Sequence, residues 1–210
     1  MNEDGSLLPL SVADLLTAVA KDEPTPGGGA VAAVTAALAA ALAGMAARYS
    51  RRSSPEQQLL RGLAEQADAL CSRAARLADA DAEAYREYVR AARLPRNPDP
   101  EPRRRAITGA LEAAAAIPCE LASLAEEIAD LGRRLAFDGN PRLRSDACTA
   151  ALVAAAAAAG AALLVADNLA ARPGDRRITE AHASAARARE LADAALSGPA
   201  STAAPERTHS

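Results

Sequence analysis

Residues 24–49, PTPGGGAVAAVTAALAAALAGMAARY, contain a proline-punctuated turn, three glycines and a long apolar helix, and the rest of the chain is organised around them. Pro24 and Pro26 each fix a φ angle and favour extended backbone in the residue before them, so the chain reaches Gly27 without helical structure. After the glycines, large apolar residues recur every three or four positions, which is the spacing of one helix face. These residues are Val31, Val34, Leu38, Leu42 and Met45.

The three glycines, Gly27, Gly28 and Gly29, therefore stand at the N-terminus of this helix. They have no side chains to keep a ligand from the backbone, and the N–H groups and positive dipole end of a helix N-terminus attract anions or a polarised oxygen. No Lys-Ser or Lys-Thr pair follows, which excludes a P-loop, and the spacing is not the G-x-G-x-x-G of a dinucleotide site. The structural alternative is a sharp entry into a close-packed helix.

The composition and the helical spacing predict an all-α fold, a multi-helix bundle with long alanine-rich helices. Half of the 210 residues are apolar, yet only 2% are aromatic and there is no Trp. Alanine side chains bury little area each, so we expect the bundle to bury a further face in a homodimer or higher oligomer. The predicted helices cover residues 12–23, 31–49, 56–93, 103–135, 146–167 and 175–197.

We assign residues 1–196 to a single helical domain and expect residues 197–210, which are small and polar, to be a disordered tail. Pro118 falls inside the helix predicted over residues 103–135. There it should kink the helix and leave the carbonyl of Ala114 as an acceptor for a ligand or water.

The charge and cysteine content exclude several classes of function. The net charge of −3, the pI near 5.5 and the four aromatic residues disfavour nucleic-acid binding. Cys71, Cys119 and Cys148 lack metal-ligand spacing, so we expect no metal and thiols kept in a reducing compartment. The acidic N-terminus lacks a basic signal region, which favours a cytoplasmic protein. Residues 30–47 and 147–166 are long enough for membrane spans, but alanine predominates, so we predict buried helices and no membrane partner.

An acidic residue interrupts the apolar stripe of the helix predicted over residues 56–93. The stripe continues in steps of three and four to Asp81, which Tyr85 and Tyr88 follow. Burying an ionised Asp without a partner is costly, so Asp81 should be paired, protonated or at a cavity. An ion pair with an arginine of a neighbouring helix is the structural alternative. The preceding members of the stripe are Leu59, Leu63, Ala67, Leu70, Ala74 and Leu77.

A second turn, residues 137–145, precedes the other long apolar helix. Asn140 makes a good helix start, with Ser145 as a competing cap. Asp146 then lies near a helix N-terminus, which favours its ionised form. It is either a simple first-turn acid or a second functional carboxylate. Gly160, among alanines, suits a close helix crossing.

Arg48, Arg51 and Arg52 form a basic group at the end of the glycine-led helix and in the loop after it. Such a loop is usually a solvated connection. If it lies near the glycine turn, its guanidinium groups can hold an anionic ligand tail.

Taken in order, these motifs resemble the cyclodeaminase and methenyltetrahydrofolate cyclohydrolase family of folate enzymes, related to the C-terminal half of formiminotransferase-cyclodeaminase. Their order and spacing cover nearly the whole chain, which is more specific than any one motif. The sequence departs from the family at residues 51–55 and at Leu164, where an asparagine is expected. The matching pieces are PTPGGG at 24–29 opening a helix that reaches Met45, DADAEAY at 79–85, IPCE at 117–120, Gly139 through Ser145 and Asp146, and Gly160-Ala161 with Asn168.

The resemblance implies an all-helical homodimer that takes a tetrahydrofolate derivative as substrate at or near the subunit interface, with no metal and no other cofactor. It implies Asp81 and Asp146 as catalytic carboxylates. Asp81 would attract the positively charged methenyl group and accept a proton from water, and Asp146 would orient water or pass a proton to the leaving nitrogen. The implied substrate-binding residues are Pro26, Gly27, Gly28, Gly29, Arg48, Arg51, Arg52 and Asn168, with the arginines on the glutamate carboxylates.

Two reactions of the carbon that joins N5 and N10 fit the resemblance. In cyclohydrolysis, water opens 5,10-methenyltetrahydrofolate to 10-formyltetrahydrofolate. In cyclodeamination, N10 attacks a formimino carbon and ammonia leaves. We predict cyclohydrolysis, because the single-domain chain has no room for a separate formiminotransferase domain. The alternatives are a formiminotetrahydrofolate cyclodeaminase and a non-catalytic folate-binding or assembly module.

Overall fold

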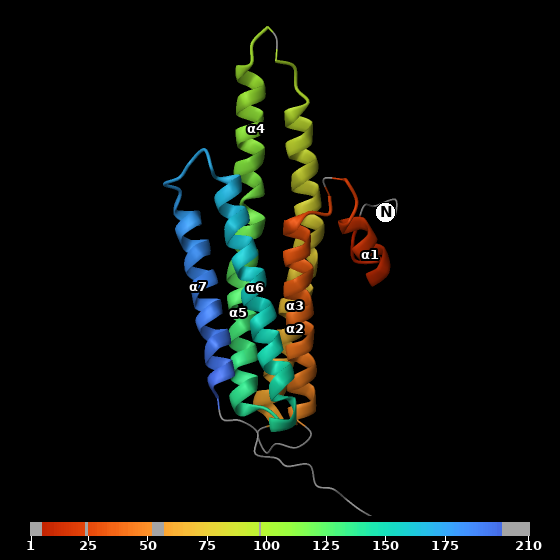
Figure 1. Ribbon diagram of the computed structural model, residues 1–210, viewed down its shortest axis with the longest axis vertical. Coiled ribbons are helices and arrows are strands. Elements are labelled where there is room, and N and C mark those ends of the chain that lie inside the picture. Colours follow the sequence, from red (N-terminus) through yellow and green to blue (C-terminus); the bar gives the residue numbers. More distant parts are fainter. Residues whose placement is uncertain (1–5, 24, 52–56, 97, 199–210) are drawn as a thin grey trace, which may run out of the picture.

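The computed structural model describes residues 6–23, 25–51, 57–96 and 98–198, and over these residues the fold is all-helical, as predicted. Helices α2, α3, α5, α6 and α7 pack into an elongated bundle, beyond which α3 and α4 project as a hairpin (Figure 1). The predicted tail lies outside the described residues from residue 199 onward. The elements are α1 Val12–Val19, α2 Gly28–Arg51, α3 Gln57–Ala92, α4 Glu101–Ala114, α5 Ala116–Asp138, the 3₁₀ helix η1 Pro141–Leu143, α6 Arg144–Asn168 and α7 Arg176–Ser197.

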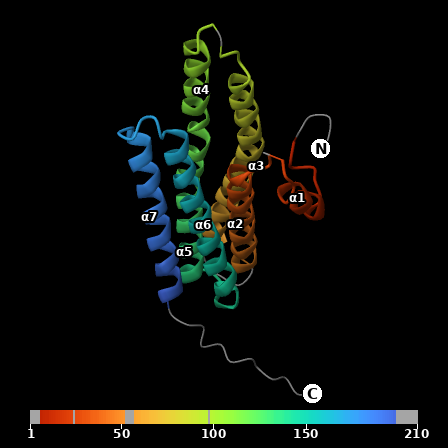
Figure 2. The same ribbon diagram turned by 45° about the horizontal axis from the view of Figure 1, so that its top comes forward.

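Helix α1 stands beside the bundle rather than in it, as the two ribbon views show (Figures 1 and 2). Ser11 caps the helix by accepting a hydrogen bond from the N–H of Asp14 at 3.1 Å. None of the residues of α1 is buried. The segment before α1 is anchored to α3, where the Asp79 carboxylate accepts hydrogen bonds from the Leu7 N–H at 2.8 Å and the Ser6 hydroxyl at 2.7 Å.

Alanine makes up most of the buried core of α2 and α6. The small side chains allow helix axes to approach closely, and the leucines of α5 fill the remaining space. Both long alanine-rich segments predicted as buried helices thus have one face inside the bundle. Fully buried residues include Ala33, Ala36, Ala40 and Ala43 of α2, Leu124 and Ile128 of α5, and Ala150, Ala151, Ala154, Ala158 and Ala161 of α6.

By length and composition alone, three described segments are apolar enough to cross a membrane: Gly28–Ser50, Glu101–Asp138 and Pro141–Asn168. In the first and third, 56% of the most apolar window is buried inside the bundle. Helix packing therefore accounts for much of the apolar character of these two segments. The absence of a membrane partner stays a prediction from the sequence.

The helix predicted over residues 103–135 is divided into α4 and α5 at Ala115. Pro118 lies three residues further on and has no N–H to donate to the carbonyl of Ala114. The interruption therefore occurs where the sequence predicted a kink. It lets α4 lean toward α3, against which it packs.

The close helix crossing predicted at Gly160 occurs instead at Gly132. A Cβ atom on Gly132 would lie 2.8 Å from the backbone N of Ala151 and 2.9 Å from the carbonyl oxygen of Ala147, so α5 and α6 meet here backbone to backbone. A Cβ atom on Gly160 would meet only the Cβ of Ala32, at an ordinary 3.9 Å. Glycine is therefore required at Gly132, while the space around Gly160 accommodates a methyl group.

The variant Gly132→Ala is expected to lower the free energy of unfolding by about 1–3 kcal/mol, because the added methyl group forces α5 and α6 apart. Gly109→Ala in α4 is the matched control. A Cβ atom at Gly109 meets nothing within 4 Å, so better helix propensity should raise the free energy of unfolding by about 0.5–1 kcal/mol. Urea denaturation followed by circular dichroism measures both. A Gly132→Ala protein as stable as the wild type would contradict the close crossing.

Candidate active site

A cavity of about 260 Å³ lies where α2 begins and α6 ends, at the upper ends of both helices in Figure 1. It brings together the glycine turn, Asp81 and Asn168, which are far apart in the sequence. Side chains of α3, α4 and α6 form its walls. The lining residues are Thr25, Gly27, Gly28, Gly29, Asp81, Ala84, Tyr85, Tyr88, Leu111, Ala114, Leu164 and Asn168.

The carboxylate of Asp81 lies against the N-terminus of α2. It accepts a hydrogen bond from the backbone N–H of Ala30, and a Cβ atom on Gly29 would overlap all three atoms of the carboxylate group. Only glycine at Gly29 therefore allows α3 to bring this carboxylate to the first turn of α2. The free N–H groups and the positive end of the helix dipole favour a negative charge at this place.

Burial raises the pKa of Asp81 above its ordinary value of 3.8, and the hydrogen bond from the Ala30 N–H opposes this rise without cancelling it. No arginine contributes to the shift, so the ion pair considered as the structural alternative is not found among the described residues. Asp81 is thus a half-buried carboxyl group that faces a cavity and whose proton affinity exceeds that of an exposed Asp. Such a group can both accept and return a proton.

Two tyrosines form an aromatic wall next to Asp81. Tyr85 and Tyr88 follow Asp81 by one and two helical turns, and their ring centroids are 5.8 Å apart with the planes inclined by 49°. Across the cavity, Leu111 and Ala114 come from the last turn of α4. This combination of aromatic and aliphatic surface suits a flat, partly apolar ligand.

Helix α6 contributes an apolar residue and an amide to the cavity. Leu164 stands where the family resemblance leads us to expect an asparagine, and its Cδ2 atom would lie 3.9 Å from a Cβ atom built on Gly28. Asn168, one helical turn further on, supplies a group that can donate and accept hydrogen bonds. The polar function of this wall therefore depends on Asn168.

Other residues predicted for the site lie elsewhere in the chain. Asp146 is in the first turn of α6, about 33 Å along the helix from Asn168. Arg48 is near the end of α2, where its guanidinium donates to Asp68 at 2.6 Å. The expectation that both carboxylates and the arginines surround one cavity is thus not met within one chain.

The other predicted substrate-binding residues are Pro26, Arg51 and Arg52. Pro26 is buried behind the turn and does not line the cavity. The side chain of Arg51 and the whole of Arg52 lie outside the described residues.

Seven lining residues were not among the predicted catalytic or substrate-binding residues: Thr25, Ala84, Tyr85, Tyr88, Leu111, Ala114 and Leu164. The sequence did indicate the two tyrosines, because they lie on the same predicted helix face as Asp81. For Leu111 no such signal exists, because its side chain belongs to an ordinary apolar stripe until the break at Ala115 directs α4 toward α3.

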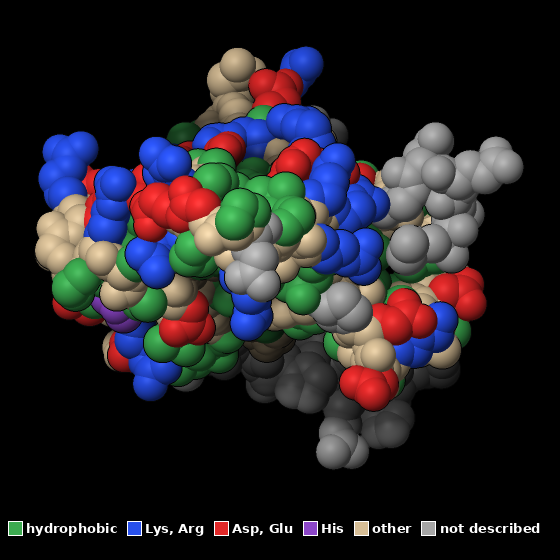
Figure 3. Space-filling view, turned by 90° about the horizontal axis from the view of Figure 1, so that it is seen from above, with side chains coloured by type: hydrophobic (Ala, Val, Ile, Leu, Met, Phe, Trp, Pro, Cys, Tyr) green, Lys and Arg blue, Asp and Glu red, His purple; other side chains and the backbone are tan. Residues whose placement is uncertain are grey.

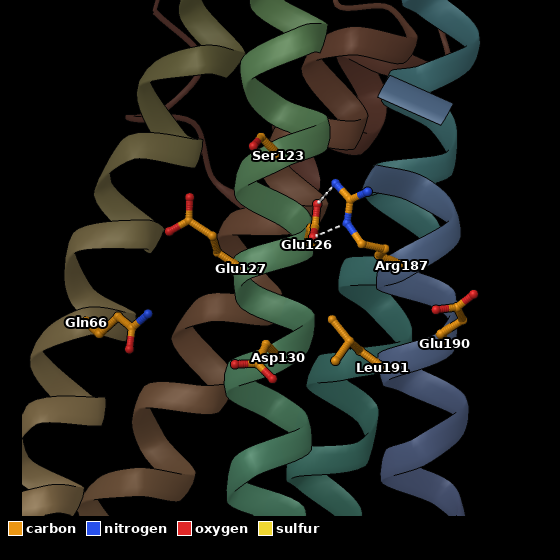
Figure 4. Close-up of a pocket in the computed structure, with 8 residues that line it drawn as sticks. All are labelled: Gln66, Ser123, Glu126, Glu127, Asp130, Arg187, Glu190 and Leu191. Carbon is orange, nitrogen blue, oxygen red and sulfur yellow. Dashed lines mark hydrogen bonds and ion pairs between the residues drawn. The ribbon is translucent and has the colours of Figure 1, made fainter. Parts of the chain in front are cut away.

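A larger, open cavity of about 670 Å³ lies between α3, α5 and α7 (Figure 4). It has four carboxylates, three of which, Glu126, Glu127 and Asp130, are in ion pairs. Figure 4 shows Glu126 bound to Arg187, whose guanidinium lowers the pKa of this carboxyl group, and Asp130 pairs with Arg133 at 2.8 Å. Most carboxylates of this cavity are thus already paired with arginines, whereas Asp81 has no such partner among the described residues, so the Asp81 cavity is the candidate site.

The described residues contain no group of three or more His, Cys, Asp and Glu side chains arranged to hold a metal ion. The three cysteines are free thiols, half-buried at Cys71 and Cys119 and buried at Cys148. The lining residues that carry polar side chains are Thr25, Asp81, Tyr85, Tyr88 and Asn168, beside the backbone N–H groups at the start of α2.

Residues 11–188 match the sequence profile of the family described as formiminotransferase-cyclodeaminase. The chain belongs to this family. The family resemblance drawn from the separate motifs is thus confirmed, and the match includes every element from α1 to the middle of α7.

Two curated family members are formimidoyltransferase-cyclodeaminases from Sus scrofa and Mus musculus. They are 34% and 35% identical to this chain over 169 residues, which is 78% of this chain and 31% of each relative. The chain therefore spans about a third of the length of these relatives. The crystal structure of formiminotetrahydrofolate cyclodeaminase from Thermotoga maritima matches with a TM-score of 0.80 and 25% identity, covering 90% of this chain and 96% of that chain.

In this family member, the raised pKa of Asp81 predicts a pH-dependent difference in stability between the wild type and Asp81→Asn. A carboxyl group with a higher pKa in the folded chain binds more protons when folded, so stability decreases as the pH rises through the interval between the two pKa values. The free energy of unfolding of the wild type, relative to Asp81→Asn, should therefore fall as the pH is raised above 3.8. Urea denaturation at a series of pH values measures it. A difference that does not change with pH would contradict the burial of this carboxyl group.

Proposed function

We propose that this protein is a formiminotetrahydrofolate cyclodeaminase. The observation that carries the proposal is the half-buried Asp81 carboxylate, which faces a cavity between a glycine-led helix N-terminus and two tyrosines. The fold similarity to the Thermotoga maritima cyclodeaminase, over nearly the whole of that chain, supports the same assignment. The sequence alone favoured the cyclohydrolase reaction. Because the similar proteins are cyclodeaminases, we now favour deamination.

The reaction needs a proton to move between two nitrogens on one carbon. N10 of the substrate attacks the protonated formimino group on N5, which gives a tetrahedral carbon bonded to three nitrogens. N10 then loses its proton, the terminal nitrogen gains one, and the bond to that nitrogen breaks as ammonia leaves. The product is the methenyl cation, whose positive charge is shared by N5 and N10.

Asp81 is placed to perform both proton transfers. As a carboxylate it accepts the proton of N10, and as a carboxylic acid it returns the proton to the leaving nitrogen. Its raised pKa brings the two protonation states closer in free energy than in an exposed Asp, which suits this double role. The ionised form also attracts the cationic product carbon. A single carboxylate in the cavity is therefore sufficient.

The other walls suit the pterin ring of the substrate. Tyr85 and Tyr88 offer aromatic surface for stacking, and the Asn168 amide and the N–H groups of the glycine turn can pair with the polar edge of the ring. A cavity of 260 Å³ is smaller than typical sites for drug-sized ligands, which measure about 300–1,000 Å³. It fits the bicyclic head of a folate, while the rest of the substrate extends outside.

We also propose that the protein is a homodimer that associates through α2 and α6. These adjacent helices expose large apolar side chains, with 64% of Leu38 and 62% of Leu163 accessible, and no charged residue occurs in residues 28–47 or 147–166. An uncharged apolar face of this length is typical of an interface. If the two bundles run in opposite directions, the end of one that carries Arg48 and Asp146 lies near the cavity of the other. A cytoplasmic location stays a prediction from the sequence.

Asp81→Asn is expected to lower the rate of ammonia release from 5-formiminotetrahydrofolate by about 10²–10⁴-fold, because the amide cannot transfer the proton. Asp79→Asn is the matched control, since this carboxylate is two residues away on α3 and holds the N-terminal segment instead. Ammonia release and methenyl absorbance, measured together, give the rate.

Full turnover in Asp81→Asn would contradict the role of this residue. Loss of methenyl absorbance without any ammonia-releasing activity would identify the protein as a cyclohydrolase. Folate binding with neither reaction would identify a non-catalytic module.

Leu163→Glu is expected to convert the dimer into a monomer, because it places a charge in the middle of the apolar face of α6. Leu59→Glu on α3 is the control, since Leu59 is also exposed but lies outside α2 and α6. Sedimentation velocity at micromolar concentration measures the change. A wild-type protein that sediments as a monomer would contradict the proposed interface.

A further inference from the structure

Helix α1 presents an apolar face that no described part of the chain covers. Val12, Leu16 and Val19 follow one another at intervals of four and three, so they lie along one side of the helix. All three are exposed, Val12 at 75% and Leu16 at 65%, and so is Leu8 in the turn before the helix. We call these four residues the α1 face.

The chain's own bundle gives α1 little support. The helix has eight residues, none of them buried, and only Leu15 and Ala18 are half-buried. In the part of the chain that the structure describes, α1 makes no extensive contact with another helix. Because isolated helices shorter than about 12–15 residues are marginal in water, a further surface has to stabilise α1.

The charge of α1 disfavours a lipid surface as its partner. Helices that lie on membranes are typically rich in Lys and Arg on the polar side, whereas residues 6–20 contain a single charged residue, Asp14. Seen from above, the described part of the side on which α1 stands in Figure 1 shows more Asp and Glu than Lys and Arg (Figure 3). An uncharged apolar protein surface is the better match.

The chain itself carries such a surface on α2 and α6. Residues 28–47 and 147–166 contain no charge, and α2 directly follows the α1 segment in the sequence. In both ribbon views α2 lies between α6 and α1, so α1 stands on the side of α2 that is remote from α6 (Figures 1 and 2). The α1 face can therefore extend the apolar surface of α2 and α6.

The size of a stable interface also favours a second copy as the partner. Such an interface buries about 800 Å² on each subunit. Among the described residues, α2 and α6 expose large aliphatic side chains by 40% to 64%, and the α1 face exposes the same number by 38% to 75%. Including α1 thus roughly doubles the large aliphatic surface that is available for burial. The exposed aliphatic residues of α2 and α6 are Val31, Leu38, Leu152 and Leu163.

We propose that the α1 face packs on the α2 and α6 surface of a second copy of this chain, so that the two subunits of the dimer exchange their α1 helices. In a two-fold dimer this contact occurs twice, which doubles its contribution. The inference rests on the proposed dimer and is independent of the proposed reaction.

A single tryptophan on α1 tests the contact directly, because the full-length chain contains no Trp. In Leu16→Trp, the fluorescence emission should shift to shorter wavelength as the protein concentration rises, with the same midpoint as dimer formation in sedimentation velocity. Thr17→Trp is the matched control, since Thr17 is also exposed but lies on the other side of α1. Its emission should stay at long wavelength at every concentration.

A polar double variant measures what the contact contributes. Val12→Ser with Leu16→Ser should raise the dissociation constant of the dimer at least tenfold, because four apolar side chains per dimer lose their cover. In the Leu163→Glu background, which is expected to be monomeric, the same two changes should leave the free energy of unfolding unchanged. Thr17→Ser is the control and should leave the dissociation constant as it is.

A dimer of Leu16→Trp with emission at long wavelength would overturn the α1 contact and leave the dimer through α2 and α6 standing. A monomeric wild type would overturn both. A shift to shorter wavelength on vesicles of phosphatidylcholine and phosphatidylserine, with none on dimer formation, would identify a lipid surface instead. Emission at short wavelength in the monomer would show that the chain covers α1 itself, which would also overturn the exchange.

Discussion

The contact between the Asp81 carboxylate and the N-terminus of α2 is the constraint on which the candidate site depends. Because Gly29 has no side chain, α3 can deliver a carboxylate to the exposed N–H groups of the first turn. Burial raises the pKa of this group while the helix N-terminus stabilises its charge. The result is a half-buried carboxyl group that binds a proton more tightly than an exposed Asp, which suits the proton transfers that we propose.

Small side chains also determine how the rest of the bundle packs. Alanine lets α2, α5 and α6 approach until the backbones of α5 and α6 touch at Gly132. Each alanine removes little area from water, so a bundle of this kind gains from covering a further apolar face. The exposed leucines of α2 and α6 provide that face, and it adjoins Leu164 and Asn168 at the cavity. The high alanine content therefore leads us to expect both a dimer and a site that the dimer shelters.

Helices α2 and α3 end at different heights beside the cavity, so one end of α3 is exposed. Helix α3 extends eleven residues beyond Asp81, to Ala92, while α2 begins beside Asp81. The cavity beside the start of α2 is partly open and partly apolar, whereas the projecting part of α3 presents its arginines to solvent.

Local patterns in the sequence determined the helices and the inward position of Asp81, because helix periodicity and a carboxylate on an apolar stripe are properties of neighbouring residues. The glycine turn was recognisable for the same reason. Only the tertiary structure decided which helix ends lie side by side. Since α2 and α6 run in opposite directions, the start of α2 lies beside Asn168 at the end of α6, and Asp146 lies at the far end. The position of Leu111 at the cavity likewise depends on how α4 packs against α3, which no local pattern records.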